Sequence, residues 1–116
     1  MAHKIFDMPF SKIYPLYVAK VTKKGRSVEE LNQLIFWLTG HSEDSIKLVL
    51  DQNISNQDFF HHAPRMHPLA HQVKGNICGV RVETIEDPMM RNIRILDKLV
   101  DDCAKGKPLE KILPKE

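Results

Sequence analysis

Apolar residues recur every three or four positions along several stretches of the chain, and a capping residue precedes each stretch. The pattern is clearest between Ser27 and Gly40. Its apolar positions, which share one face of a helix, are Leu31, Leu34, Ile35 and Leu38. Ser27 and Glu30 have the spacing of a capping box, and Gly40 supplies a left-handed end. This stretch therefore predicts a helix with one buried face.

Similar signals predict three more helices in the first half of the chain. Ser11 is expected to cap the first, in which Pro15 is tolerated because first-turn amides lack intrahelical acceptors. Ser42 is expected to cap another. Ser55 begins a short helix that ends before Pro64, because a residue that precedes proline avoids helical angles. The apolar positions of these three helices are Ile13, Tyr17 and Val21, then Ile46, Val49 and Leu50, then Phe59 and Phe60.

The longest helix is expected to begin at Asp87, with Pro88 at its first helical position. Its apolar residues at helical spacing are Met89, Ile93, Leu96, Val100 and Cys103. A cation, a left-handed residue and a helix breaker close it: Lys105, Gly106 and Pro108. The tail from Leu109 to Leu113 adds one more turn.

Residues from Cys78 to Thr84 alternate between apolar and polar types, which is the pattern of a half-buried strand. A lone strand is not stable, so this segment either pairs with another part of the chain, of which Lys4 to Phe6 is one candidate, or forms an extended loop. The sequence therefore predicts a mostly α fold. We expect about five helices in one compact domain over residues 1–116, with at most one short β element near Cys78 to Thr84.

The composition is that of an ordinary globular domain. With 116 residues, 42% hydrophobic and 28% charged, the chain fits neither the disordered nor the membrane class. No apolar run approaches the roughly 18 residues that a membrane span needs, and the first ten residues lack the apolar run of a signal peptide. Cys78 and Cys103 fit neither a redox pair nor a zinc spacing, so we expect buried free thiols in a reducing cytoplasm.

Positive charge gathers around Gly25, where the first helix is expected to end. The residues between Ser11 and Ser27 include no carboxylate but five cations: Lys12, Lys20, Lys23, Lys24 and Arg26. We call the part from Lys20 to Arg26 the basic hinge. Tyr14 and Tyr17 lie on the same helix, where they can stack on a ligand or form half-buried core. The cations can bind a polyanion, but cations also complement the C-terminal end of a helix.

Acidic residues follow the basic hinge. Residues 29–60 hold six carboxylates and one lysine, so hinge and acidic segment can pair within the fold or across a homodimer. A net charge of only +2 makes nucleic acid an unexpected partner. The helices around Gly40 have helix-turn-helix spacing, but the second carries Glu43, Asp44 and Asp51 against Lys47, which would repel phosphates. A structural helical hairpin is favoured.

Four histidines crowd one segment: His61, His62, His67 and His71. Imidazoles four positions apart on a helix can share zinc, but Pro68 interrupts the interval from His67 to His71. No acidic or thiol ligand is interleaved, and no nucleophile accompanies the histidines for acid–base chemistry. We therefore expect a polar loop, with no metal and no other cofactor.

Several runs of the sequence are distinctive: YPLYVAKV, KKGR, WLTG, CGVRVE, EDPMM, LDKLVDD and AKGKPLEKIL. Together they resemble a family of small bacterial proteins catalogued only as a domain of unknown function. The resemblance covers nearly the whole chain. It implies a bacterial, single-domain, intracellular protein, and it implies no activity, substrate or cofactor.

A binding or interaction module is the function that the sequence favours, with a homodimer as one form of it. The candidate ligand-binding residues are Tyr14, Tyr17, Lys20, Lys24, Arg26 and Arg81. One alternative is a nucleic-acid-associated protein that uses the basic hinge. A second alternative is a small enzyme that acts on an anionic substrate, because lysine, arginine and tyrosine together suit phosphate or carboxylate groups. No catalytic signature accompanies these residues.

Overall fold

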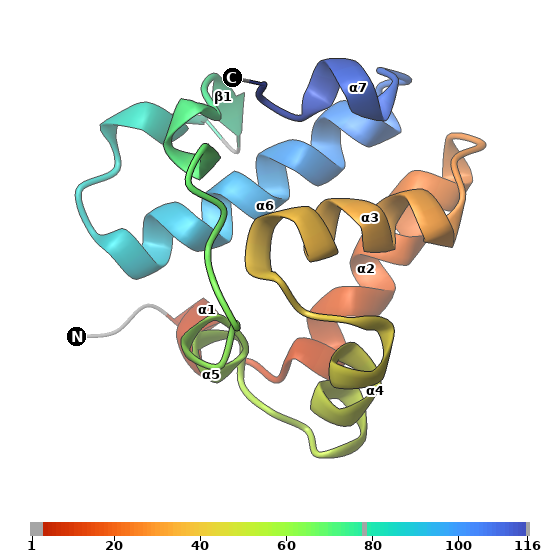
Figure 1. Ribbon diagram of the computed structural model, residues 1–116, viewed down its shortest axis with the longest axis vertical. Coiled ribbons are helices and arrows are strands. Elements are labelled where there is room, and N and C mark those ends of the chain that lie inside the picture. Colours follow the sequence, from red (N-terminus) through yellow and green to blue (C-terminus); the bar gives the residue numbers. More distant parts are fainter. Residues whose placement is uncertain (1–3, 78, 116) are drawn as a thin grey trace.

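Helix α6 (Pro88–Ala104) runs through the centre of the molecule, and the other elements pack around it (Figure 1). The computed structural model describes residues 4–77 and 79–115. The larger helices before α6 are α2 (Phe10–Lys23), α3 (Val28–Thr39), α4 (Glu43–Asp51) and α5 (Asn56–His61). The short elements are α1 (Lys4–Asp7), the 3₁₀ turns η1 (Ala70–Gln72) and η2 (Val82–Thr84), and α7 (Leu109–Ile112). The prediction of a mostly α fold is confirmed, with seven α-helices in the described residues.

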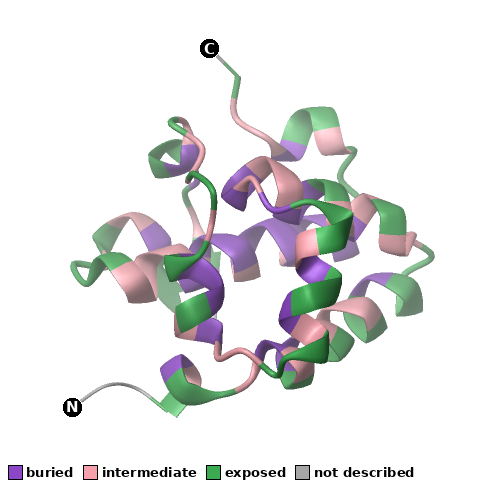
Figure 2. Ribbon diagram, turned by 60° about the horizontal axis from the view of Figure 1, so that its bottom comes forward, coloured by how far each residue is buried: buried purple, intermediate pink, exposed green. Residues whose placement is uncertain are grey.

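The central place of α6 follows from its sequence. Asp87 caps the helix as expected, because its Oδ1 atom accepts a hydrogen bond from the Met90 amide at 3.0 Å. The side chains that it buries most completely are Ile93, Ile95, Leu96, Leu99, Val100 and Cys103. They cover more than one face of the helix, since α2, α3 and α5 all contact it (Figure 2). Burial also raises the pKa of the Cys103 thiol, which is a free cysteine.

The turn between α2 and α3 confirms the predicted helix boundaries there. Gly25 has a positive φ of 80°, a conformation that glycine adopts without a steric penalty. The capping box is present, since the Glu30 amide donates to the Ser27 hydroxyl and the Glu30 carboxylate accepts from the Ser27 amide. Gly40, with φ 73°, ends α3 as predicted.

The start of α2 differs from the prediction. The helix begins at Phe10 after Pro9, and Ser11 does not cap it. Instead, the Ser11 hydroxyl donates to Oδ1 of Asn53 at 2.6 Å. The segment before α2 lies against the start of α5, where Pro9 and Ser55 form an isolated antiparallel bridge. Tertiary contacts therefore set this helix start, where a local cap was expected.

The alternating segment forms a small hairpin. Strand β1 (Asn76–Ile77) pairs antiparallel with β2 (Val80–Arg81), and η2 follows directly. The expected short β element is confirmed by β2, but its partner is the neighbouring pair of residues and not residues 4–6, which belong to α1. Cys78, for which a buried thiol was expected, lies outside the described residues.

Gly75 lets this hairpin pack closely on α6. The residue has a φ of 115°, and a Cβ atom placed on it would lie 2.7 Å from Cε of Lys98. Lys98 is itself buried and pairs with Asp102 one turn later, with its Nζ atom 2.8 Å from Oδ1. The stem of a buried lysine thus covers the backbone of the hairpin.

No helix within the described ranges is long and apolar enough to cross a lipid bilayer.

Candidate functional site

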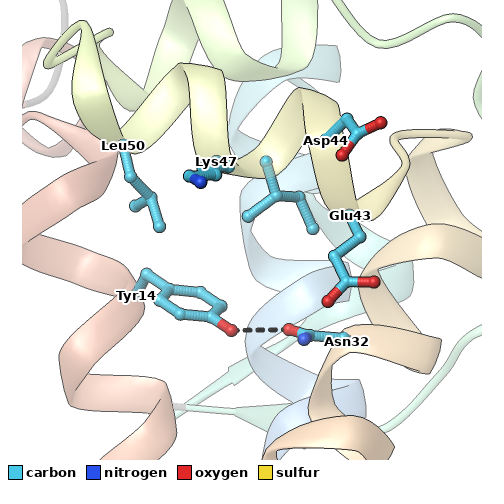
Figure 3. Close-up of a pocket in the computed structure, with 7 residues that line it drawn as sticks. Tyr14, Asn32, Glu43, Asp44, Lys47 and Leu50 are labelled. Carbon is cyan, nitrogen blue, oxygen red and sulfur yellow. Dashed lines mark hydrogen bonds between the residues drawn. The ribbon is translucent and has the colours of Figure 1, made fainter.

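A cavity of about 360 Å³ opens between α2, α3 and α4 (Figure 3). Tyr14 enters from α2 and Asn32 from α3. Helix α4 contributes the rest of the lining: Glu43, Asp44, Ile46, Lys47 and Leu50.

The N-terminal turn of α4 places two carboxylates at this cavity. Ser42 caps the helix as predicted and forms a reciprocal pair with Ser45, at 2.8 and 3.1 Å. Glu43 and Asp44 therefore stand in the first helical turn, where carboxylates complement the helix dipole. Further along α4, Ile46 is buried and Leu50 is half-buried, so both supply an apolar wall.

His41 holds this turn of α4 in place. Its imidazole is 4% exposed and stacks on the ring of Phe59 with centroids 4.5 Å apart. Nδ1 lies 2.9 Å from the Ser45 hydroxyl and Nε2 lies 3.0 Å from the Phe59 carbonyl oxygen. Burial lowers the pKa of His41, so the neutral ring donates to Phe59 and accepts from Ser45. The sequence analysis did not single out this residue.

Tyr14 and Asn32 form the polar pair at the base of the cavity. The Tyr14 hydroxyl donates to Oδ1 of Asn32 at 2.6 Å, and the dashed line in Figure 3 marks this bond. Burial raises the pKa of Tyr14, the bond to Asn32 opposes that shift, and the charges of Glu29 and Glu43 add to it. Tyr14 therefore stays protonated, and the amide hydrogens of Asn32 remain donors that a ligand can use.

The charges around the cavity are not neutralised inside the fold. Among the described residues, Glu43, Asp44 and Lys47 form no ion pair. A smaller cavity of about 120 Å³ adjoins this one, because Asn32 and Glu43 line both. Glu29 also lines the smaller cavity, so the two cavities together present three carboxylates and one lysine. The combined surface is acidic.

Of the six residues that the sequence analysis selected, the structure places only Tyr14 in this cavity. Tyr17 turns toward α6, where its hydroxyl donates to the Asp97 carboxylate. Lys20 also faces α6, with its Nζ atom 3.1 Å from Oδ1 of Asp101. Lys24 is an exposed residue at the end of α2, and Arg81 is an exposed residue on the hairpin.

Arg26 joins the basic hinge to the end of α6. Its Nη1 atom donates to the carbonyl oxygens of Cys103 at 2.9 Å and Lys107 at 2.7 Å. Its Nε atom donates to Oε2 of Glu30 at 3.0 Å, and Nη2 also contacts that carboxylate. The hydrogen bond from Arg26 lowers the pKa of Glu30 to about 2. Two cations of the basic hinge, Lys20 and Arg26, therefore connect α2 and the turn after it to the end of α6.

Two histidines of the predicted polar loop, His67 and His71, have partners within the fold. The ring of His67 stacks on Trp37 with centroids 4.0 Å apart, and its Nδ1 accepts from the Leu69 amide at 3.0 Å. Nδ1 of His71 lies 2.8 Å from the carbonyl oxygen of Pro68. Within residues 4–77 and 79–115, no three or more His, Cys, Asp or Glu side chains gather as metal ligands would.

Sequence reasoning missed most of the cavity lining. The acidic residues of α4 counted only against a DNA-binding role, and Asn32 was not considered. A signal was nevertheless present, because Glu43, Lys47 and Leu50 follow a helical i, i+4, i+7 spacing that places them on one face.

Comparison with known proteins assigns a family but no activity. Residues 4–114 match a bacterial family described as "Uncharacterized protein conserved in bacteria (DUF2200)". The chain is also similar to the uncharacterized protein SP1917, whose crystal structure shares 42% sequence identity and a TM-score of 0.90. That match covers 97% of this chain and 92% of the other. A search of curated proteins gives no match.

Proposed function

Because the chain belongs to this bacterial family, whose description names no activity, we propose its function from its own geometry. The protein is a binding module that takes an amine or guanidinium group carried on a short apolar stem. This group enters the cavity between α2, α3 and α4, which we call the amine cavity. The observation that carries the proposal is the pair of unneutralised carboxylates, Glu43 and Asp44, beside the half-buried Tyr14.

The sign of the charge favours a cation. Two carboxylates line the cavity against one ammonium, and Glu29 lines the adjoining space. Glu43, Asp44 and Glu29 are exposed, so their attraction for a cation is added to by the half-buried ring of Tyr14 and the apolar wall. The face of the Tyr14 ring adds a cation–π contribution of about 0.5–2 kcal/mol.

The shape of the cavity suits a ligand with an apolar part. Its volume of about 360 Å³ falls within the usual range of small-molecule sites, roughly 300–1,000 Å³. Ile46 and Leu50 offer an apolar wall to a short alkyl chain. A lysine or arginine side chain of a partner protein has this same chemistry, so a basic segment of another protein is one source of the ligand.

The other functions considered from the sequence receive less support. An anionic substrate would need Tyr14, Tyr17, Lys20 and Arg81 in one pocket, but Tyr17 and Lys20 bond to carboxylates of α6. A nucleic acid would need the basic hinge, in which Lys20 and Arg26 already have acidic or carbonyl partners. A cytoplasmic location, expected from the cysteines, is part of our proposal.

The test compares three probes of similar size and different charge: n-butylammonium, n-butylguanidinium and butyrate. Calorimetry or amide chemical shifts should show saturable binding of the two cations, with shifts at residues of α2, α3 and α4, and no comparable binding of butyrate. The Glu43→Gln, Asp44→Asn double variant should lose about tenfold or more in affinity, because it removes two charged partners.

The matched control is Asp51→Asn, which neutralises an exposed carboxylate of the same helix outside the cavity lining. It should leave cation binding unchanged. Thermal melts of all variants check that the fold is retained. Equal binding of butyrate and the cations, or cation binding that the double variant retains in full, would contradict the proposal.

A further inference from the structure

A second cavity of about 230 Å³ lies between η1 and the first turns of α6, and the proposed binding of amines does not use it. Arg91, Asn92 and Ile95 reach it from one face of α6, while Ala70 and His71 reach it from η1. Ile95 and Ala70 are buried, at 2% and 7% exposure, so the cavity has an apolar wall beside its polar groups.

Arg91 is the unusual residue of this cavity. Its Nη2 atom donates to the carbonyl oxygen of His71 at 3.3 Å, but its Nε atom is buried and has no hydrogen-bond partner among the described residues. Within the same residues no carboxylate forms an ion pair with Arg91. A guanidinium is always charged and carries five N–H donors, and a buried charged donor without an acceptor is costly. The Nε–H group of this charged side chain thus lacks an acceptor among the described residues.

The groups next to Arg91 include further hydrogen-bond donors. Asn92 brings an amide group to the same cavity. His71 lines the cavity as well, but its Nδ1 atom donates to the carbonyl oxygen of Pro68, so Nε2 of the neutral ring is an acceptor and adds no donor. Glu86, an exposed carboxylate, also lines the cavity without forming an ion pair with Arg91.

We propose that this second cavity binds a small oxyanion, a carboxylate or a phosphate, whose oxygens accept hydrogen bonds from the guanidinium of Arg91. Arginine suits both groups, because its planar fork can donate two parallel hydrogen bonds to a pair of oxygens. The Asn92 amide is a second donor to the same anion. The apolar wall of Ile95 and Ala70 accommodates the carbon chain of a carboxylate, which a phosphate ion lacks.

The experiment follows the Nε–H resonances of the arginines in ¹H–¹⁵N spectra of the full chain. Acetate, butyrate and inorganic phosphate are titrated separately against chloride at constant ionic strength. We expect a saturable shift of the Arg91 Nε–H signal with at least one of these anions. A preference for butyrate over phosphate identifies an organic carboxylate as the ligand class, and the reverse preference identifies a phosphate.

Three variants sharpen the result. Arg91→Gln should weaken the binding by about tenfold or more, because it removes a charged donor. Arg81→Gln, which makes the same charge change at an exposed position on the hairpin, should leave the affinity unchanged. Glu86→Gln should strengthen anion binding, because it removes a carboxylate from the cavity wall.

The proposal is overturned if no anion produces a saturable shift at Arg91. Such a result would mean that Arg91 takes no anion and that its Nε–H group stays unpaired in the fold. Binding that Arg91→Gln and Arg81→Gln reduce equally would also overturn it, since the effect would then come from net charge. If Arg91→Gln does not fold, the titration of the unmodified chain and the strengthening expected for Glu86→Gln decide the question.

Discussion

Arg26 donates a hydrogen bond to the carbonyl oxygen of Cys103, 77 residues further along the chain. The same guanidinium bonds the carbonyl of Lys107 and the carboxylate of Glu30. One side chain therefore satisfies backbone acceptors at the end of α6 and also anchors the start of α3. Carbonyls at the end of a helix lack intrahelical partners and carry partial negative charge, so a cation is well suited to this place.

The first prediction is that Arg26→Ala destabilises the protein by about 1.5–3 kcal/mol, the range for hydrogen bonds that involve a charged group. Arg26→Lys should recover only part of this loss, because an ammonium cannot reproduce the planar fork. Urea denaturation measures both. Lys23→Ala, at an exposed position of the same basic hinge, is the control and should change stability by less than about 0.5 kcal/mol. Equal effects at the two positions would mean that Arg26 acts only through its charge.

The second prediction concerns acid pH. The folded pKa of Glu30 is about 2, below its ordinary value of 4.5, so its ionised form stabilises the fold. This contribution is fully present above pH 4.5 and is lost as the pH falls toward 2. Glu30→Gln should therefore be less stable than the natural sequence at pH 6, and the difference should shrink between pH 4.5 and 2. Melts across this pH range check the result, and a constant difference would contradict it.

The third prediction compares two glycines of positive φ. Gly75→Ala should cost more stability than Gly79→Ala, because a Cβ atom at Gly75 meets Cε of Lys98 at 2.7 Å and one at Gly79 meets nothing within 4 Å. Both variants suffer backbone strain of about 1–2 kcal/mol. Overpacking adds about 1–3 kcal/mol at Gly75 alone. Chemical denaturation of the two variants measures the difference, and equal losses would show that Lys98 moves aside freely.

The fourth prediction tests the centre of the core. Leu96 is 1% exposed, so Leu96→Ala should cost about 2–5 kcal/mol through lost burial and the cavity it leaves. Leu16, which is 66% exposed on α2, is the matched control, and Leu16→Ala should change stability by less than about 0.5 kcal/mol. Denaturant unfolding of both variants is the measurement. A loss at Leu96 below about 1 kcal/mol would mean that α6 is not central to stability.

Helix starts were predictable where their causes are local. The side chains of Ser27, Ser42, Ser55 and Asp87 each accept a hydrogen bond from a backbone amide three residues later, as the sequence indicates. The predicted cap at Ser11 was wrong because a distant contact decides this helix start. The Ser11 hydroxyl donates to Asn53, 42 residues away. The short β element near Cys78 to Thr84 was expected, but its partner strand was missed because Asn76–Ile77 has only two residues, which is too short to show periodicity.

The candidate site was less predictable than the fold. The concentration of charge in the basic hinge is visible in the sequence, but its partners on α6 are not. Tyr17, for example, bonds Asp97, 80 residues later, and no local pattern reports that pairing. The amine cavity exists only because α4 folds back beside α2 and α3, and this depends on tertiary packing. Arg91 attracted no prediction, because the missing acceptor of its Nε atom appears only in three dimensions.

The central position of α6 also affects how the chain is made. A ribosome synthesises α2, α3 and α5 well before α6, although all three pack against it. A nascent chain that has not yet reached residue 88 exposes side chains such as Phe10, Leu31 and Leu34, which are fully buried in the finished fold. Because exposed apolar surface of this kind promotes aggregation, the emerging chain is most vulnerable to aggregation until its last long helix is complete.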